Sequence, residues 1–218
     1  MDDWLSDPLT IPDATKPGWT IRQPSRTFPK PSWELWWSFH YATRLKLEGA
    51  VYFCGQLLGA SSLPDGLGLP LLTHRLGVWH SNAFFFHLCS AYETVLQEAN
   101  VIYECGLGVG EVEWRAIKPK LPTDLRELME RRRNEAWFKE VVAFRNLATH
   151  HYLVPMEKSE TGLGIKPWGV VAVDARLVCV YDKSKEVVRR DVSVSREYLT
   201  RMLGHISEVW TQMAEKFK

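Results

Sequence analysis

Residues 73–103 read THRLGVWHSNAFFFHLCSAYETVLQEANVIY, and this stretch determines the fold that we predict. It includes three consecutive phenylalanines, Phe84, Phe85 and Phe86, so apolar groups lie nearly all around a helix drawn through it. A helix that is apolar on every side is stable only where other elements cover it. We therefore predict a long helix over 73–103 at the centre of a helical bundle.

A second long helix is predicted on the N-terminal side of this stretch. Ser32 is a suitable N-cap, and helical sequence continues from about Trp33 to Leu58. The segment 59–72 contains three glycines and two prolines and is predicted to be a loop. Two long helices joined by such a loop are expected to pack as an antiparallel pair.

The C-terminal half is predicted to add two more helical segments after a loop at 106–121. Helical sequence starts at Pro122 and continues to about His150, with a break near Arg133. Ser195 caps a last helix that continues to about Phe217. The whole is a mainly α, up-and-down helical bundle.

Two segments depart from this helical pattern. Residues 1–31 hold six of the twelve prolines and are predicted to form an extended arm that packs on the domain or on a partner. Residues 164–194 contain runs of valine interrupted by a turn-like Asp182-Lys-Ser-Lys185, which predicts a small β-hairpin or meander. We therefore expect an arm at 1–31 and a single helical domain at 32–218 that includes this β-rich insertion.

Composition excludes several classes of protein. The 218 residues are 45% hydrophobic and 24% charged, which is typical of a globular chain, and the net charge of +1 gives no bulk attraction to nucleic acid or membrane. The longest apolar run, 49–60, is too short to span a bilayer, and the N-terminus lacks a secretory signal. Four cysteines without a C-x-x-C pair indicate a reduced, cytoplasmic setting. Ten tryptophans favour a homo-oligomer.

Three patterns are given structural rather than functional interpretations. Gly106-Leu-Gly108-Val-Gly110 is followed by acidic residues and not by a convincing helix start, so a loop is favoured over a phosphate site. His80 and His87 share a helix face, but no third ligand has compact spacing, so metal binding is not predicted. The triplet 131–133 is Arg-Arg-Arg, and a basic surface turn is favoured over an RNA guide.

The candidate chemistry lies in residues 144–152, FRNLATHHY. Arg145, Asn146 and His150 place a guanidinium, a carboxamide and an imidazole directly after the apolar stripe of a helix. At about 100° per residue, Asn146 and His150 share one face, whereas Arg145 and His150 are about 140° apart. The side chains of Arg145 and His150 can converge either if the helix ends before His150 or if two copies of the chain meet across a symmetry axis.

The arrangement Arg145-Asn146-x3-His150 resembles the signature of the HEPN superfamily, which is an Arg, four to six residues, and a His, often with Asn, Asp or His directly after the Arg. Requiring the Asn lowers the number of matches expected by chance in this chain to roughly 0.03. The predicted architecture over 32–155 is also similar, because two long helices precede the motif and the motif ends a helix. We interpret the chain as a HEPN-like protein.

This resemblance implies a homodimeric, metal-independent endoribonuclease that acts as a toxin or in defence against phage. Single-stranded RNA would be cleaved by its own 2′-OH, leaving a 2′,3′-cyclic phosphate and a 5′-hydroxyl, and DNA would be spared. His150 would transfer protons, Arg145 would hold the phosphoryl oxygens, and Asn146 would orient the phosphate or His150. The scheme requires no metal or other cofactor.

Three neighbouring residues are accessory candidates. Tyr152 completes Arg-x4-His-x-Tyr, which is similar to HEPN toxins whose MNT nucleotidyltransferase antitoxin adenylylates this tyrosine. The resemblance therefore implies a modification site at Tyr152 and an MNT-type antitoxin or another protein regulator as partner. His151 adjoins the site, and Glu140 is a candidate for orienting a site residue, although a solvated helix charge is the simpler interpretation.

Two other hypotheses remain open. The first is a non-catalytic HEPN-like module that binds a nucleotide or a protein in the same groove, which the balanced charge and the added segments favour. The second treats Arg145, Asn146 and His150 as structural groups that cap the helix end and bond buried backbone. Activity toward RNA and the melting temperature of single substitutions distinguish the three.

Overall fold

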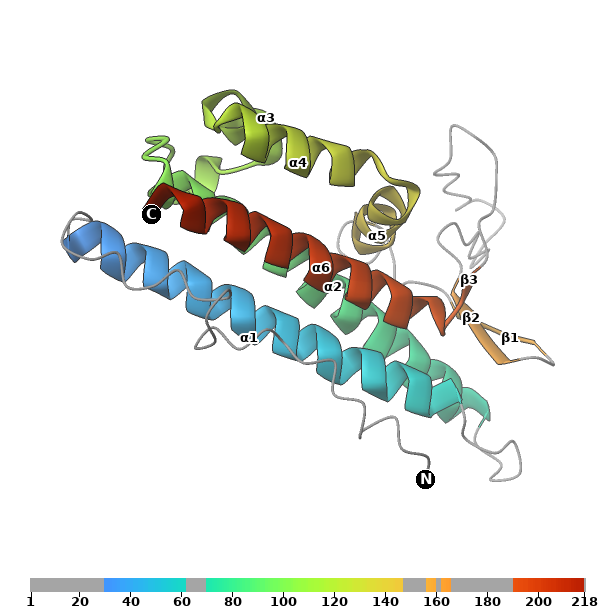
Figure 1. Cartoon of the computed structure of the whole chain (residues 1–218). Helices are drawn as coiled ribbons and strands as arrows, with labels where there is room; N and C mark the ends of the chain where they lie inside the picture. The colour runs from blue at the N-terminus through green and yellow to red at the C-terminus, as the bar shows by residue number, and fades with distance from the viewer. Residues whose placement is uncertain (1–29, 62–69, 147–155, 160–161, 166–189, 218) are drawn as a thin grey trace, which may run out of the picture. The chain divides into compact units, whose positions relative to one another are not determined.

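The structure is a computed structural model that describes residues 30–61, 70–146, 156–159, 162–165 and 190–217 (Figure 1). These residues form six α-helices and three short strands. The prediction of a mainly helical chain is thus confirmed. Residues 1–29 of the arm predicted at 1–31, and most of the predicted β-rich insertion, lie outside the described residues.

The two long helices predicted first are present as α1, Lys30–Ser61, and α2, Pro70–Ile102. The expected cap at Ser32 is wrong, because α1 already begins at Lys30 and accommodates Pro31 in its first turn, where proline is tolerated. The buried residues of α1 recur every three or four positions and so form one continuous seam. They are Trp36, His40, Thr43, Leu47, Ala50, Cys54 and Leu57, and Gly55 is buried beside them.

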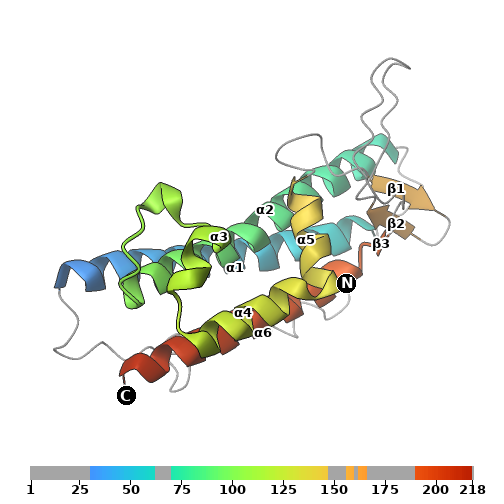
Figure 2. The ribbon, with the colours of Figure 1, turned by 90° about the horizontal axis from the view of Figure 1, so that it is seen from above.

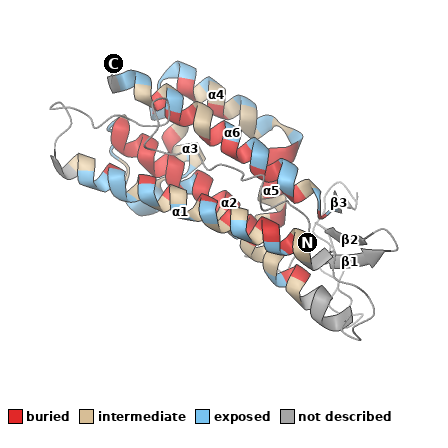
Figure 3. Ribbon diagram, turned by 60° about the horizontal axis from the view of Figure 1, so that its bottom comes forward, coloured by how far each residue is buried: buried red, intermediate tan, exposed pale blue. Residues whose placement is uncertain are grey.

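Burial along α2 only partly matches the prediction of a helix covered on all sides. Phe84 and Phe85 are fully buried, but Phe86 is 47% exposed. Every residue from Thr94 to Ile102 is buried, so the C-terminal third of α2 does hold the central position that the sequence predicts. Figure 3 shows the corresponding run of buried residues along this helix.

The predicted helix from Pro122 onward consists of α4, Thr123–Asn134, and α5, Ala136–Asn146. The break lies at Glu135, two residues after the predicted position, where the backbone becomes extended with φ −65° and ψ 146°. A short helix, α3, Trp114–Ile117, and 3-10 turns at Val109–Glu111 and Lys118–Lys120 occupy the loop expected at 106–121. Four residues are too few to leave a helical period in a sequence.

The C-terminal helix, α6, covers Val194–Ala214 and continues into a 3-10 turn at Glu215–Phe217, close to the predicted bounds. Three strands precede it in an antiparallel sheet: β1, Met156–Ser159; β2, Gly162–Ile165; and β3, Arg190–Asp191. The sheet begins at Met156, earlier than the segment 164–194 in which strands were predicted.

The chain divides into two compact units, each made of separate stretches of sequence. The first comprises residues 1–49, 87–135 and 199–218, and the second comprises 50–86 and 136–198. Consequently α4 belongs to the first unit and α5 to the second, while α1, α2 and α6 contribute to both. Within the first unit α4 runs beside α6 (Figure 2), and their side chains meet where Arg132 pairs with Glu208. A single domain over 32–218 stays a prediction.

Candidate functional site

The candidate motif begins on α5, which is held in the second unit by an aromatic cluster. Trp137, Phe138, Val141 and Phe144 are buried at helical spacing. The Phe144 ring stacks on Phe85 of α2 with centroids 4.6 Å apart and planes 18° apart. The ring centroid of Tyr198, on α6, lies 6.3 Å from that of Phe85 and 6.5 Å from that of Phe144. The residue just before Arg145 is thereby fixed between two other helices.

A polar contact adds to this anchoring one turn earlier on α5. The Tyr198 hydroxyl donates a hydrogen bond to the carboxylate of Glu140. Tyr198 is only 2% exposed, whereas Glu140 is half-buried. Glu140 therefore ties α5 to the first turns of α6, a role that differs from the solvated helix charge of the simpler interpretation. Its action on a site residue stays a prediction.

Arg145 and Asn146 lie side by side at the end of α5. The Nη1 of Arg145 donates a hydrogen bond to the Oδ1 of Asn146 at 3.2 Å. Asn146 is exposed and Arg145 is half-buried. This contact places a carboxamide and a guanidinium, both of which carry N–H donors, next to each other at the end of the helix. Adjacent donors of this kind suit the oxygens of a phosphate or carboxylate.

The structure thus brings together the first two residues of the predicted catalytic set. His150, His151 and Tyr152 lie outside the described residues. Their distances from Arg145, and the two hypotheses on how His150 converges with it, stay predictions.

The glycine-rich segment is occupied by the protein's own groups. The backbone N–H of Gly108 donates to the carboxylate of Glu111 at 2.9 Å, so a side chain already uses this amide. The carboxamide of Asn100 bonds both the N–H and the carbonyl of Leu107, at 3.2 and 2.9 Å. Gly106 adopts φ +72°, which glycine tolerates at no steric cost. These contacts agree with a structural loop and not with a phosphate cradle.

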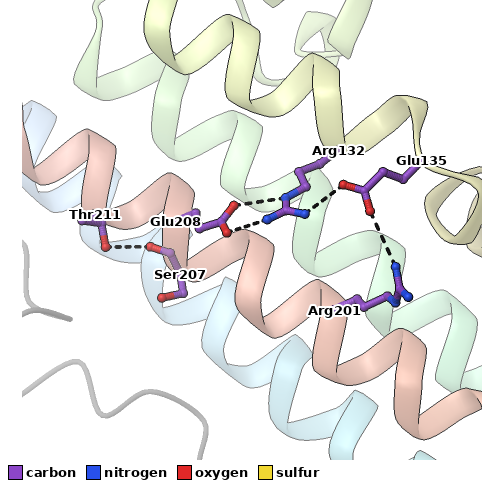
Figure 4. A network of polar contacts seen from close by, with 6 residues as sticks. All are labelled: Arg132, Glu135, Arg201, Ser207, Glu208 and Thr211. Atoms are coloured by element: carbon purple, nitrogen blue, oxygen red, sulfur yellow. Dashed lines mark hydrogen bonds and ion pairs between the residues drawn. The ribbon is translucent and has the colours of Figure 1, made fainter.

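The arginine triplet is largely engaged within the first unit. Arg132 donates from Nε and Nη2 to the two carboxylate oxygens of Glu208, at 3.1 and 2.6 Å, and from Nη1 to Glu135 at 2.9 Å (Figure 4). The guanidinium of Arg133 lies over the rings of Tyr92 and Trp114, 5.5 and 5.1 Å from their centroids. Only Arg131 of the three is fully exposed. The expected surface turn is wrong, because the triplet lies in the last turn of α4 and two of its three guanidiniums have internal partners.

The histidines of α2 also have packing environments. The ring centroids of His80 and Phe53 are 6.1 Å apart, and the ring of His87 lies against Gly49. Burial lowers the pKa of both imidazoles, and the charge of Lys46 contributes to the shift at His87. In the part of the chain that the structure describes, no group of three or more His, Cys, Asp or Glu side chains could hold a metal ion.

A buried polar cluster in the first unit was not predicted from the sequence. Glu98 of α2 has no exposed surface and accepts from Thr43 Oγ1 at 2.5 Å and from Trp210 Nε1 at 3.0 Å. Its Oε2 also lies 3.0 Å from Nδ1 of His40, which is 2% exposed. The signal was a glutamate inside the helix predicted to be central, together with His40 and Thr43 on the inward seam of α1. With all its members buried, the cluster joins three helices and offers no access to a substrate.

A second buried group surrounds His205 of α6. Its ring stacks on Tyr92, with centroids 5.6 Å apart, and is 1% exposed. Burial lowers the pKa of His205 to about 4, and burial raises the pKa of Tyr92 to about 12. Both groups are therefore neutral at neutral pH and contribute packing.

Comparison with known proteins identifies no relative: no family model, no curated protein and no solved structure matches the chain. Among the described residues, no helix has the length and apolar character that crossing a membrane requires. The functional conclusion therefore depends on the residues themselves.

Proposed function

We propose that the chain is a HEPN-like, metal-independent endoribonuclease that cleaves single-stranded RNA by attack of the 2′-OH on the adjacent phosphodiester. The observation that carries the proposal is the pairing of Arg145 with Asn146 at the end of α5. The remaining support is the sequence Arg145-Asn146-x3-His150 and the mainly helical fold. The HEPN-like bundle topology, the β insertion, the homodimer and the role as toxin or defence effector belong to the same proposal.

The chemistry assigns a distinct task to each residue. The transition state is a phosphorane with additional negative charge on its non-bridging oxygens. Arg145 stabilises this charge through two parallel N–H donors. The Asn146 amide, held by Arg145, donates to the same group. His150, whose side chain titrates near neutral pH, removes the proton of the 2′-OH or protonates the leaving 5′-oxygen.

The anchoring of α5 explains why this geometry would be reproducible from one catalytic cycle to the next. A donor pair at a frayed helix end loses rotational order each time the helix opens. The ring stack of Phe144 on Phe85 and the bond from Tyr198 to Glu140 lie within the last two turns of α5. They restrain the backbone that carries Arg145, which supports preorganisation of the site.

The direct test is incubation of the purified full-length chain with single-stranded RNA in EDTA. We expect fragments with 2′,3′-cyclic phosphate and 5′-hydroxyl ends, and no cleavage at a position where the RNA carries a single 2′-deoxynucleotide. His150→Ala and Arg145→Ala are expected to abolish cleavage while melting within a few degrees of the wild type. Retained cleavage in both variants would contradict the assignment of the site.

The alternative of a non-catalytic module has one specific observation in its favour. Arg132 and Arg133 are engaged in internal contacts, which leaves less positive surface for RNA than the sequence offers. Specific binding of a nucleotide or protein without cleavage of any RNA tested would select this alternative. Strong loss of stability in the single substitutions would instead favour the structural role. Adenylylation of Tyr152 by an MNT-type partner, and assistance by His151, are tested only once cleavage is established.

A further inference from the structure

The side of α1 that faces away from its buried seam is unusually apolar for a solvent-exposed surface. Within the first unit it carries Trp37, Tyr41 and Leu45, whose exposed fractions are 48%, 55% and 46%. The exposed carboxylates of Glu34 and Glu48 lie at its two ends. At about 100° per residue these five positions fall within about 80° of helix circumference. We refer to them as the outer face of α1.

The size of this face is that of a contact site. Large side chains of this kind offer about 150–250 Å² each, so three that are about half exposed leave on the order of 300 Å² of mostly apolar surface. Isolated exposed apolar residues are normal on proteins, whereas a contiguous patch of this extent is comparable to the largest on a typical monomer, and such patches often have a function.

The charge of the outer face restricts what can cover it. Its two charged residues are both acidic, and in the segment 32–59 of α1, where exposure is described, no Lys or Arg is fully exposed. Arg44 and Lys46 are both half-buried, and Lys46 donates to the carbonyl of Ser90 at 3.3 Å. A suitable occupant therefore combines apolar side chains with cations.

The sequence directly before α1 has this composition. Residues 14–30 contain four cations and no Asp or Glu, and they include Trp19, Ile21 and Phe28. The cations are Lys16, Arg22, Arg26 and Lys30. Prolines in the same segment reduce the conformational entropy lost on binding, and aromatic surfaces are suited to proline-rich segments.

The length of the segment also fits. Glu34 and Glu48 are separated by about 21 Å at 1.5 Å per helical residue. An extended proline-rich chain advances about 3.1 Å per residue, so about seven residues cover that distance. A segment joined directly to the start of α1 at Lys30 is present at high effective concentration, which favours it over a second molecule.

We propose that residues 14–29 dock on the outer face of α1 in the same chain, with their apolar side chains on Trp37, Tyr41 and Leu45 and their cations toward Glu34 and Glu48. The proposal concerns an interaction within the chain and is independent of the ribonuclease activity.

Hydrogen–deuterium exchange of the full chain tests it. We expect backbone amides of residues 14–29 to exchange at least about ten-fold more slowly than an unstructured peptide of the same sequence. Trp37→Ala removes this protection, whereas the matched control Trp79→Ala, a tryptophan of α2 that is 58% exposed, leaves it unchanged. Exchange of 14–29 at the unstructured rate in the wild type would overturn the proposal, as would equal protection in both variants.

A charge exchange provides the second test and does not depend on removing apolar surface. Arg22→Glu with Arg26→Glu is expected to abolish the protection, and adding Glu34→Arg with Glu48→Arg is expected to restore it. Failure of the four-fold variant to recover protection contradicts the charge pairing. Protection that increases with protein concentration places the segment on a second copy and overturns docking within the chain.

Discussion

Replacing Glu98 by alanine tests the account of the first unit most severely. Its carboxylate has no exposed surface. It accepts hydrogen bonds from Thr43 Oγ1 at 2.5 Å and from Trp210 Nε1 at 3.0 Å, and it lies 3.0 Å from Nδ1 of His40. Alanine would leave the buried ring nitrogens of His40 and Trp210, from two other helices, without this partner, while the Thr43 hydroxyl would keep only the carbonyl of Phe39. Leaving a buried polar group unsatisfied costs about 1–3 kcal/mol, so with two such groups we expect a loss of stability of about 2–6 kcal/mol.

Glutamine at the same position is the matched control. The amide oxygen of Glu98→Gln can accept from His40 and Trp210, while its nitrogen faces the Thr43 hydroxyl. That hydroxyl also lies 3.0 Å from the carbonyl of Phe39, so it can donate there and accept from the amide. We expect a loss of only about 1 kcal/mol.

Urea denaturation followed by tryptophan fluorescence measures both effects. The midpoint of Glu98→Ala should fall far below that of Glu98→Gln with an unchanged slope, because the surface exposed on unfolding is the same. Equal midpoints for alanine and wild type would refute the reasoning that this carboxylate joins α1, α2 and α6.

Three further outcomes follow from other contacts. A Cβ on Gly49 would lie 2.5 Å from Nδ1 of His87, so Gly49→Ala alone should lower the free energy of unfolding by about 1–3 kcal/mol. In a His87→Ala background the same substitution should stabilise by up to about 1 kcal/mol, because alanine favours the helix. A double-mutant cycle in urea measures both effects, and equal effects in the two backgrounds would contradict the close approach. Burial lowers the pKa of His205 to about 4 from 6.5, so between these pH values the unfolded chain binds a proton that the folded chain does not. As pH falls from 6.5 to 4, the stability of the wild type should therefore decrease by about 3 kcal/mol more than that of His205→Phe. Parallel profiles of stability against pH for the two proteins would contradict this explanation. Tyr198→Phe removes the bond to Glu140 and should lower stability by about 1–2 kcal/mol and slow RNA cleavage, whereas unchanged thermal melting would show that the bond has no net value.

The helices could be predicted because their signals are local. The seam of α1 repeats every three or four residues, and the phenylalanines of α2 lie in the segment 73–103, which contains no proline and is too long for a strand. The break between α4 and α5 was expected near Arg133 and lies at Glu135, whose carboxylate bonds Arg132 and lies 3.7 Å from Arg201 of α6. The partner on α6 is distant in sequence, so local propensity could not fix the position.

The candidate site was predicted only in part for the same reason. Arg145 and Asn146 are neighbours in sequence, and their side-chain contact is local. The partner of Glu140 is 58 residues away, and those of Glu98 are 58, 55 and 112 residues away, so nothing in a single sequence pairs them. The exposure of Phe86 was missed because periodicity reports which side chains are apolar and not which of them find a neighbour.

The most direct test of the central claim is the rate at which Arg145→Ala cleaves a short single-stranded RNA in EDTA, compared with Arg131→Ala as a matched control on an exposed arginine. We expect a loss of about 100-fold or more for Arg145→Ala, the magnitude associated with removing one transition-state donor, and little change for Arg131→Ala. Equal rates in the two variants, with both chains folded, would contradict the claim that Arg145 and Asn146 form a ribonuclease centre.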